Sequence, residues 1–239
     1  MTSRQLFDAG KLQAAIEALG VELRDNPADA QRRTFLFELL CFTGNFDRAE
    51  KQLDVLSSSG PEAGMGALVY RSALHAERLR AEMFRNKTFP LDAAPANEFS
   101  GTLNGKPFSS LEDGDPRIGA RLEVFAAGQY SWIPWMHVAR LKIEPPKRLR
   151  DLLWTPAVLT TTQDFRGEEL GEILLPALAP LSFGSTDDEI RLGRATDWVD
   201  LPEGGFAPLG QKMLLVDGEP FPLLSIRELE ISIADKAAS

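Results

Sequence analysis

Residues 10–19 read GKLQAAIEAL, and residues 44–53 read GNFDRAEKQL. Glycine, a large apolar residue, alanine and leucine recur between the two stretches at a spacing of 34 residues, as Gly10 and Gly44, Leu12 and Phe46, Ala15 and Ala49, and Leu19 and Leu53. Pro27 and Pro61 continue the same spacing. A lag of 34 residues is typical of helix–turn–helix repeats, so the N-terminal part is predicted to be a stack of helical hairpins.

Each recurring position has a mechanical role in such a repeat. The alanines let two helices approach closely, and the large apolar residues form the buried stripe of an amphipathic helix. The glycines suit a turn that needs a positive φ, and the prolines separate one repeat from the next. The period is that of the tetratricopeptide repeat. Stacked repeats leave a concave surface that binds other proteins, which favours an interaction protein over an enzyme.

Helices are expected near residues 3–9, 11–24, 28–43, 46–58 and 62–85, the last being a long helix that caps the stack. Residues 88–97 hold two prolines and three alanines without periodicity, which predicts a linker. We therefore expect a helical repeat domain over residues 1–95 and a second domain over residues 96–239.

The second part has the pattern of short strands joined by polar turns. Asn104-Gly105 predicts a type I′ turn between strands at 99–103 and 106–109. A short helix is expected over 118–127, a helical turn over 148–153, and further strands over 130–135, 138–144, 157–162, 172–175, 195–201, 210–217 and 221–233. The predicted fold class is multi-domain α+β, with a tetratricopeptide-like α–α superhelix followed by an antiparallel sheet or barrel-like domain.

Composition excludes several classes of function. The 239 residues carry a net charge of −9; residues 96–239 contribute 14 basic and 22 acidic side chains, against 12 and 13 in residues 1–95. Such an acidic chain repels phosphate backbones, so nucleic acid is not an expected partner. We find no apolar run that could span a membrane and no signal segment, and Cys41 has no cysteine to pair with, so a cytoplasmic protein without membrane contact is expected.

Motifs for chemistry are scarce. The sequence lacks a phosphate-binding loop, a dinucleotide fingerprint, a nucleophile elbow and a zinc-ligand cluster, so no cofactor, no metal and no catalytic residue are expected. Carboxylates cluster at 112–115 and 187–189, where helix capping or a solvated turn is the favoured interpretation. A hydrolase that uses Asp115 and Asp187 is the alternative from another class.

Four residues of the second domain are candidate partner contacts: Asp115, Arg117, Trp132 and Trp135. Tryptophan is enriched at binding hot spots, but packing inside a small sheet domain is the favoured role for these rings. Buried ion pairs that fix loops are the alternative for the charged residues.

Several short motifs follow one another in the second half. They are SGTLNGKPF from Ser100, DPRIG from Asp115, GQYSWIP from Gly128, LRDLLWTPA from Leu149, TDW from Thr196, LGQKMLL from Leu209 and PLLSIRELEI from Pro222. In this order they resemble the ImpE/TagJ family, also described as SciE-type proteins, which are accessory proteins of bacterial type VI secretion. The stretch RTFLFELLCFTGNFDRA from Arg33 is also similar. Family members usually have another helical stretch where this chain has the linker at 88–97.

The resemblance implies a non-enzymatic adaptor that binds the small sheath subunit and links it to the sheath-disassembly ATPase. A repeat groove that accepts an amphipathic partner helix agrees with this. From the repeat register, Gln31, Thr34, Phe35 and Glu38 are expected to face the groove, whereas Leu36, Phe37 and Leu40 pack internally. The alternative function is a generic tetratricopeptide-like scaffold that binds another protein.

Overall fold

The computed structural model describes residues 1–58, 61–89, 99–165, 170–202 and 204–233. The helices of the N-terminal part begin and end within two residues of the predicted positions: α1 (Ser3–Asp8), α2 (Leu12–Asp25), α3 (Ala30–Phe42), α4 (Phe46–Ser57) and α5 (Pro61–Asn86). The predicted domain boundary near residue 95 lies outside the described residues.

The 34-residue register acts as predicted. Gly10 and Gly44 adopt φ values of +73° and +67° in the turns before α2 and α4, a conformation that favours glycine. A Cβ on Gly44 would lie 2.5 Å from the ring of Phe183, so close packing adds to the backbone requirement. The apolar members of the register, Leu12, Ala15, Leu19, Phe46, Ala49 and Leu53, are all buried in one core. Cys41 is buried as a free thiol in the same core.

The β-rich part, residues 99–233, is built from antiparallel strands. They are β1 (Phe99–Leu103), β2 (Lys106–Phe108), β3 (Leu111–Asp113), β4 (Arg121–Ala126), β5 (Gln129–Pro134), β6 (Val138–Ile143), β7 (Trp154–Thr161), β8 (Gly171–Pro176), β9 (Thr196–Asp200), β10 (Phe206–Gly210), β11 (Met213–Val216), β12 (Glu219–Pro222) and β13 (Glu228–Ile233). Short helical turns interrupt them: η1 (Trp135–His137), η2 (Leu149–Leu152), η3 (Ser182–Gly184), α6 (Asp188–Arg191) and η4 (Leu223–Ser225).

The strands form an open antiparallel sheet and two small accessory sheets, which confirms the antiparallel sheet and corrects the barrel-like alternative. The main sheet has the order β2-β1-β13-β6-β7-β8-β4-β5, and β3, β11 and β12 make a second sheet while β9 and β10 form a hairpin. In the described part of the chain, β2 and β5 stand at opposite ends of the main sheet and do not pair, so the barrel is not closed. Asn104 and Gly105 have φ values of +50° and +78°, as the predicted type I′ turn requires.

The prediction of a helix over residues 118–127 is wrong, because residues 121–126 form strand β4. Its first five residues, RLEVF, are all buried, so the strand shows no alternation between a core face and a solvent face. A short continuous apolar run cannot be assigned to helix or strand by periodicity. Ala127 and Gly128 then adopt positive φ values and turn the chain into β5, rather than ending a helix. Strands β3, β10 and β12 were not predicted.

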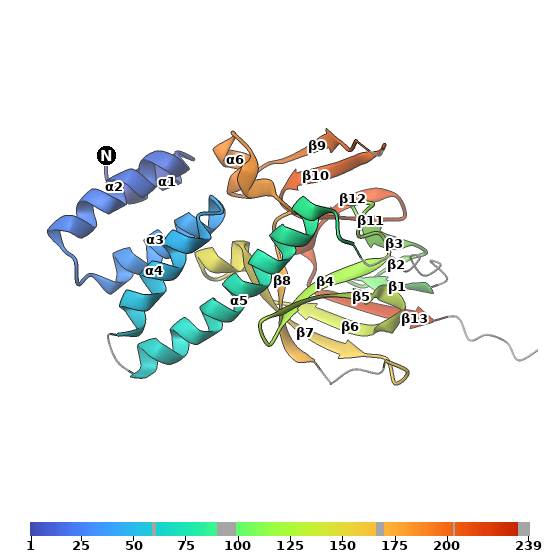
Figure 1. Cartoon of the computed structure of the whole chain (residues 1–239). Coiled ribbons are helices and arrows are strands. Elements are labelled where there is room, and N and C mark those ends of the chain that lie inside the picture. The colour runs from blue at the N-terminus through green and yellow to red at the C-terminus, as the bar shows by residue number, and fades with distance from the viewer. Residues whose placement is uncertain (59–60, 90–98, 166–169, 203, 234–239) are drawn as a thin grey trace, which may run out of the picture.

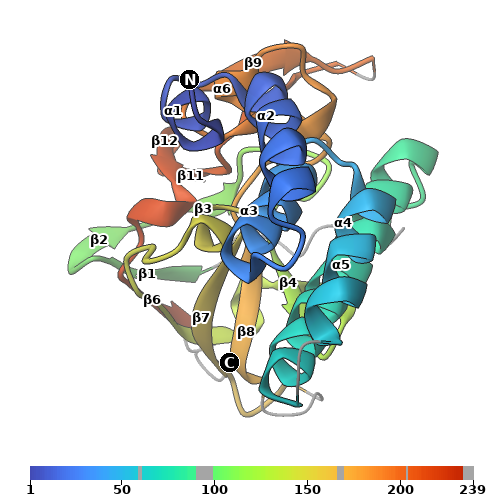
Figure 2. The same cartoon turned by 90° about the vertical axis from the view of Figure 1, so that its left-hand side faces the viewer.

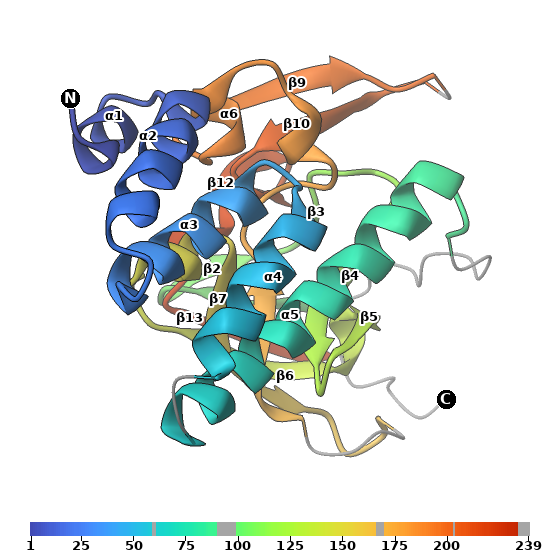
Figure 3. The same cartoon turned by 60° about the vertical axis from the view of Figure 1, so that its left-hand side comes forward.

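The helices cover one side of the β-rich part, and α5 lies between α4 and the sheet (Figures 1 and 3). After a turn of 90°, α1 and α2 are seen beside α6 (Figure 2). Asp188 of α6 accepts a hydrogen bond at 2.9 Å from the amide of Leu12, the first residue of α2. The apolar core of the helices also contains residues of the β-rich part, namely Phe125, Leu153, Trp154, Leu178 and Leu192. The two parts therefore bury their apolar surface in a shared core, whereas a second core lies inside the β-rich part.

Candidate functional site

The predicted groove residues on α3 have different surroundings. Gln31 is exposed, and Thr34 is half-buried with its hydroxyl donating a hydrogen bond to the Ala30 carbonyl at 2.9 Å. Phe35 is half-buried because its ring packs edge-on against Phe7 of α1, at a centroid distance of 5.5 Å. Leu36, Phe37 and Leu40 are buried, as the register predicts.

Glu38 does not face an open groove, which corrects the prediction for this residue. It is only 9% exposed. Burial raises the pKa of its carboxyl to about 7, and the negative charge of Asp151 acts in the same direction, against the opposing effect of Arg4 and Arg148. Glu38 is not open to a partner because the η2 segment of the same chain lies on this side of α3.

Residues 149–154, which comprise η2 and the start of β7, connect the helices to the sheet. The Trp154 indole Nε1 donates a hydrogen bond to Glu77 of α5 at 3.0 Å, and its ring lies 6.4 Å from that of Phe37. The Arg150 guanidinium lies 4.8 Å from the centre of the Tyr70 ring. Part of the surface that stacked repeats would offer to a partner is thus occupied by residues 149–154 of this chain.

We expect the burial of Glu38 to make stability depend on pH. Its pKa in the folded state, about 7, lies above the ordinary value of 4.5, so the folded state binds this proton more tightly than the unfolded state does. The stability that the proton contributes is present below pH 4.5 and is lost as the pH rises through 7. At about 1.4 kcal/mol per unit of pKa shift, Glu38→Gln should stabilise the protein at pH 8 by up to about 3 kcal/mol and have little effect at pH 4.

Urea unfolding at pH 4, 6 and 8 measures this effect, with Glu17→Gln on the exposed side of α2 as the control. A difference between Glu38→Gln and the parent protein that stays constant across this pH range would contradict the assignment.

Two of the four candidate contacts in the second domain are buried, which corrects the prediction that they face a partner. Asp115 is fully buried and accepts a hydrogen bond from Arg117 Nε at 2.8 Å. Trp135 is also fully buried, in the core of the β-rich part. Arg117 and Trp132 are half-buried, and both pack against the ring of Phe84 on α5. The structure therefore shows core packing, the favoured role, for Trp135, and a buried ion pair, the alternative role, for Asp115.

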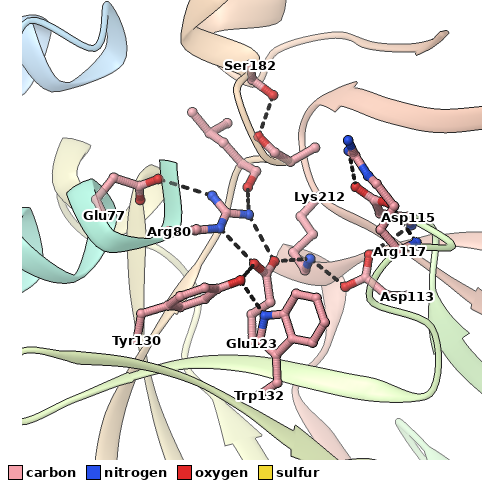
Figure 4. Close-up of polar contacts among 12 residues, drawn as sticks. Glu77, Arg80, Asp113, Asp115, Arg117, Glu123, Tyr130, Trp132, Ser182 and Lys212 are labelled. Carbon is pink, nitrogen blue, oxygen red and sulfur yellow. Dashed lines mark hydrogen bonds and ion pairs between the residues drawn. The ribbon is translucent and has the colours of Figure 1, made fainter. Parts of the chain in front are cut away.

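A buried network of charges joins α5 to the sheet (Figure 4). Arg80 of α5 forms two hydrogen bonds with the Glu123 carboxylate of β4, at 2.8 and 2.9 Å, and a third with the Leu178 carbonyl at 3.0 Å. Lys212 forms ion pairs with Glu123 and with Asp113, the latter at 2.5 Å. All four charged side chains are at most 2% exposed. Each charge in the network thus has an opposite charge within contact distance, as burial demands.

The pairing sets the ionisation of the two carboxyls in opposite directions. Burial opposes ionisation of Glu123, but Arg80 and Lys212 hold the pKa of this carboxyl at about 2. Burial raises the pKa of Asp113 to about 7, since Lys212 offsets only part of the cost and the Glu123 charge adds to it. Burial likewise raises the pKa of Tyr130, whose hydroxyl donates to Glu123. The cavity beside Arg80 measures about 20 Å³, which holds no more than a water molecule.

A cleft with mostly apolar walls lies between α5 and the sheet, and we call it the α5 cleft. It has a volume of about 600 Å³. Its apolar lining combines Val69, Tyr70 and Ala73 of α5 with Phe125, Pro156 and Leu174 of the sheet. Its charged lining consists of two arginines and two carboxylates, namely Arg148, Arg150, Asp151 and Glu172. On α5 the apolar side chains of Met65, Leu68 and Val69 are exposed. A cleft with apolar walls, an exposed apolar helix beside it and two arginines has the composition of a protein-binding surface.

The second acidic turn caps a helix, as predicted. Asp187 accepts a hydrogen bond from the Glu189 amide at 2.8 Å and is the N-cap of α6. Within the described residues, no group of three His, Cys, Asp or Glu side chains could hold a metal ion. None of the described helices is both long enough and apolar enough to cross a membrane.

Comparison with known proteins assigns both parts of the chain. Residues 105–230 match the family described as ImpE protein, and residues 6–69 match the tetratricopeptide repeat. The chain is 33% identical to the type VI secretion system accessory component TagJ of Pseudomonas aeruginosa, over 98% of this chain and 92% of that protein. This protein belongs to the ImpE family.

The overall architecture of this ImpE-family protein is shared with a solved structure. The crystal structure of protein VPA1032 from Vibrio parahaemolyticus superimposes with a TM-score of 0.84 and 25% sequence identity, covering 96% of this chain and 97% of that one. The alignment with TagJ spans 270 positions, more than the 239 residues of this chain, so the relative has additional residues within the aligned region.

The sequence patterns did not point to Arg80, Glu123, Lys212 or the α5 cleft. They included Asp113 in the acidic cluster at 112–115, but the expected capping or solvated turn is wrong for this residue, which is buried and paired with Lys212. Glu123 lies within the apolar run LEVF, and Lys212 comes directly before MLLV. A charged residue within an apolar run is the one feature that could have pointed to a buried ion pair. No comparable sequence pattern points to the α5 cleft, because its walls come from segments that are far apart in the sequence of this ImpE-family protein.

Proposed function

We propose that this protein is a non-enzymatic accessory component of the bacterial type VI secretion system. The observation that carries the proposal is the 33% identity to the accessory component TagJ over 98% of the chain. The tetratricopeptide match over residues 6–69 supports a role in binding other proteins.

We further propose that the partner is the small sheath subunit and that its amphipathic helix binds in the α5 cleft. The exposed apolar residues of α5 and the apolar walls of the cleft would cover one face of such a helix. Arg148 would favour an acidic residue at the edge of that helix, whereas Arg150 is already paired with Asp151 and lies over the Tyr70 ring. Gln31, Thr34 and Phe35 on α3 stay a prediction as additional contacts.

The surroundings of the charged residues favour binding over catalysis. Asp115 is paired with Arg117, and the charges around Glu123 are paired with one another in an interior that leaves no room for a substrate. A general acid or base must reach a bound substrate through a hydrogen bond or one water molecule. The acidic residues singled out in the sequence therefore serve the fold in this proposal.

The proposal predicts that Val69→Glu weakens binding of the sheath subunit. Val69 is 62% exposed and lines the cleft, so a charge at this position should leave the fold intact while desolvation of the charge opposes docking of an apolar helix face. Calorimetric titration with a peptide that covers the N-terminal helix of the small sheath subunit should give micromolar binding to the parent protein, and at least about tenfold weaker binding to the variant.

Val21→Glu is the matched control, because Val21 is 49% exposed on α2 and is not part of the cleft lining. Equal loss of binding in both variants would contradict the site, and binding unaffected by Val69→Glu would move the contact elsewhere. Absence of heat with a folded parent protein would favour the alternative function, a tetratricopeptide-like scaffold for another protein.

We propose that the bound protein links the sheath subunit to the sheath-disassembly ATPase in the cytoplasm. Size-exclusion chromatography of the three purified proteins tests this step. The expected result is a ternary complex that forms only when this protein is present. A sheath–ATPase complex that is equally stable without it would exclude the linking role while leaving sheath binding in place.

A further inference from the structure

A second hollow lies in the β-rich part, at the β9–β10 hairpin. It has a volume of about 500 Å³ and lies between this hairpin and the sheet of β3 and β11. Pro116, Trp198, Phe206 and Leu215 provide apolar lining, and Glu112 adds a carboxylate. We call this site the hairpin hollow.

The hairpin hollow contains both of the large aromatic side chains that are exposed in the described part of the chain. Trp198 is 37% exposed and Phe206 is 60% exposed. In the hairpin register, Trp198 is opposite Pro208 and Phe206 is opposite Asp200, so both rings and Asp200 lie on the same face of the hairpin. One edge of the Trp198 ring packs on the backbone of Gly114, where a Cβ would lie 3.3 Å from Cη2. Exposed aromatic groups gathered in one hollow are typical of a binding site.

The charge at the hairpin hollow is negative and not neutralised. Two carboxylates line the hollow: Asp113 is paired with Lys212, whereas Glu112 forms no hydrogen bond or ion pair within the described residues. Asp200, on the same face of the hairpin as the two rings, also forms none there, and the lining includes no lysine or arginine. Two basic side chains next to lining residues are already paired, Arg117 with Asp115 and Lys212 with Asp113 and Glu123. The hollow therefore attracts a cation, and residues 96–239 as a whole carry 14 basic against 22 acidic side chains.

Aromatic faces and free carboxylates together select the chemistry of the ligand. The face of an aromatic ring attracts a cation, and arginine is the commonest partner because its planar guanidinium stacks on the ring and is weakly hydrated. The same group can donate two hydrogen bonds to one carboxylate. We propose that the hairpin hollow binds an arginine side chain presented by a segment of a partner protein, at a site separate from the α5 cleft.

The experiment is an NMR titration of the full-length protein with acetyl-Gly-Arg-Gly-amide, and with the neutral analogue in which citrulline replaces arginine. The expected result is a saturable shift of the Trp198 indole N–H signal by the arginine peptide at millimolar concentration, whereas the signals of Trp135 and Trp154 stay in place. The citrulline peptide should bind at least about fivefold more weakly, since it retains the shape but not the charge.

Two variants connect the binding to the hollow. Phe206→Ala should weaken binding of the arginine peptide about threefold or more, and Glu112→Gln should weaken it and reduce its dependence on salt. Equal binding of both peptides, or shifts that spread over the acidic surface and leave Trp198 unmoved up to about 20 mM, would overturn the proposal. Binding of the sheath-subunit peptide should be the same in the parent protein and in Phe206→Ala, so failure of one site does not affect the test of the other.

Discussion

Replacing Arg80 with alanine is expected to lower the free energy of unfolding by about 3–5 kcal/mol, the cost of breaking a buried ion pair by removing one partner. Arg80 is 2% exposed and holds Glu123 through two hydrogen bonds. Its loss leaves the Glu123 carboxylate buried with Lys212 as its remaining cation, and Lys212 is shared with Asp113. Urea unfolding followed by circular dichroism measures the change in midpoint.

The control for Arg80→Ala is Arg140→Ala. Arg140 also pairs with glutamates, Glu228 and Glu230, but its side chain is half-exposed on β6. An exposed pair contributes about 1 kcal/mol or less, so the two variants separate burial from the mere presence of an ion pair. Similar destabilisation of both variants would contradict a special role for the buried network.

Simultaneous replacement of the two basic residues and of the two carboxylates that pair with them by apolar residues of similar volume should restore much of the stability that Arg80→Ala loses. The reason is that the desolvation cost disappears together with the charges. The quadruple variant Arg80→Met, Lys212→Met, Glu123→Leu and Asp113→Leu tests this, by the same unfolding measurement. A variant less stable than Arg80→Ala would mean that the network contributes more than it costs.

Local patterns in the sequence were sufficient to predict the helical part. The spacing of Gly10 and Gly44, and of Ala15 and Ala49, depends on contacts within one hairpin or between neighbouring hairpins, which lie close together in sequence. The β-rich part is different, since β1 pairs with β13 and β3 pairs with β11. Such pairings join segments more than 100 residues apart, and no local pattern specifies them.

The candidate site could be predicted only in part for the same reason. The repeat register gave the correct buried positions on α3. It carries no information about segments outside the repeat that pack on this helix, and one such segment, around Asp151, covers Glu38. Trp132 and Trp135 are three residues apart, yet only the former is partly exposed. Successive side chains of an extended segment point to opposite faces, so Trp135 lies on the buried face together with Ile133 and Trp132 lies on the other.

Trp154→Ala is expected to destabilise the whole molecule by about 3–5 kcal/mol, the usual cost of truncating a large buried aromatic side chain. Trp154 is 3% exposed, starts β7, and contacts α3 and α5 through Phe37 and Glu77. The helices share their core with residues of the β-rich part. The far-ultraviolet circular dichroism of the helices and the near-ultraviolet circular dichroism of the aromatic side chains in the β-rich part should therefore move to the same lower denaturant midpoint.

Two further variants separate the causes of that effect. Trp154→Phe keeps most of the aromatic ring but removes the N–H that donates to Glu77. We expect this variant to be less stable than the parent protein by only about 1 kcal/mol. Trp198→Ala removes a tryptophan from the exposed hairpin hollow and should cost much less than Trp154→Ala. If Trp154→Ala shifted only the near-ultraviolet transition and left the helical one in place, the helical repeat would fold independently. In that case, the shared core would add little to the stability of the repeat. A fragment that ends before the linker lacks the sheet side of the α5 cleft, so it should bind the sheath peptide only if that side is not needed for binding.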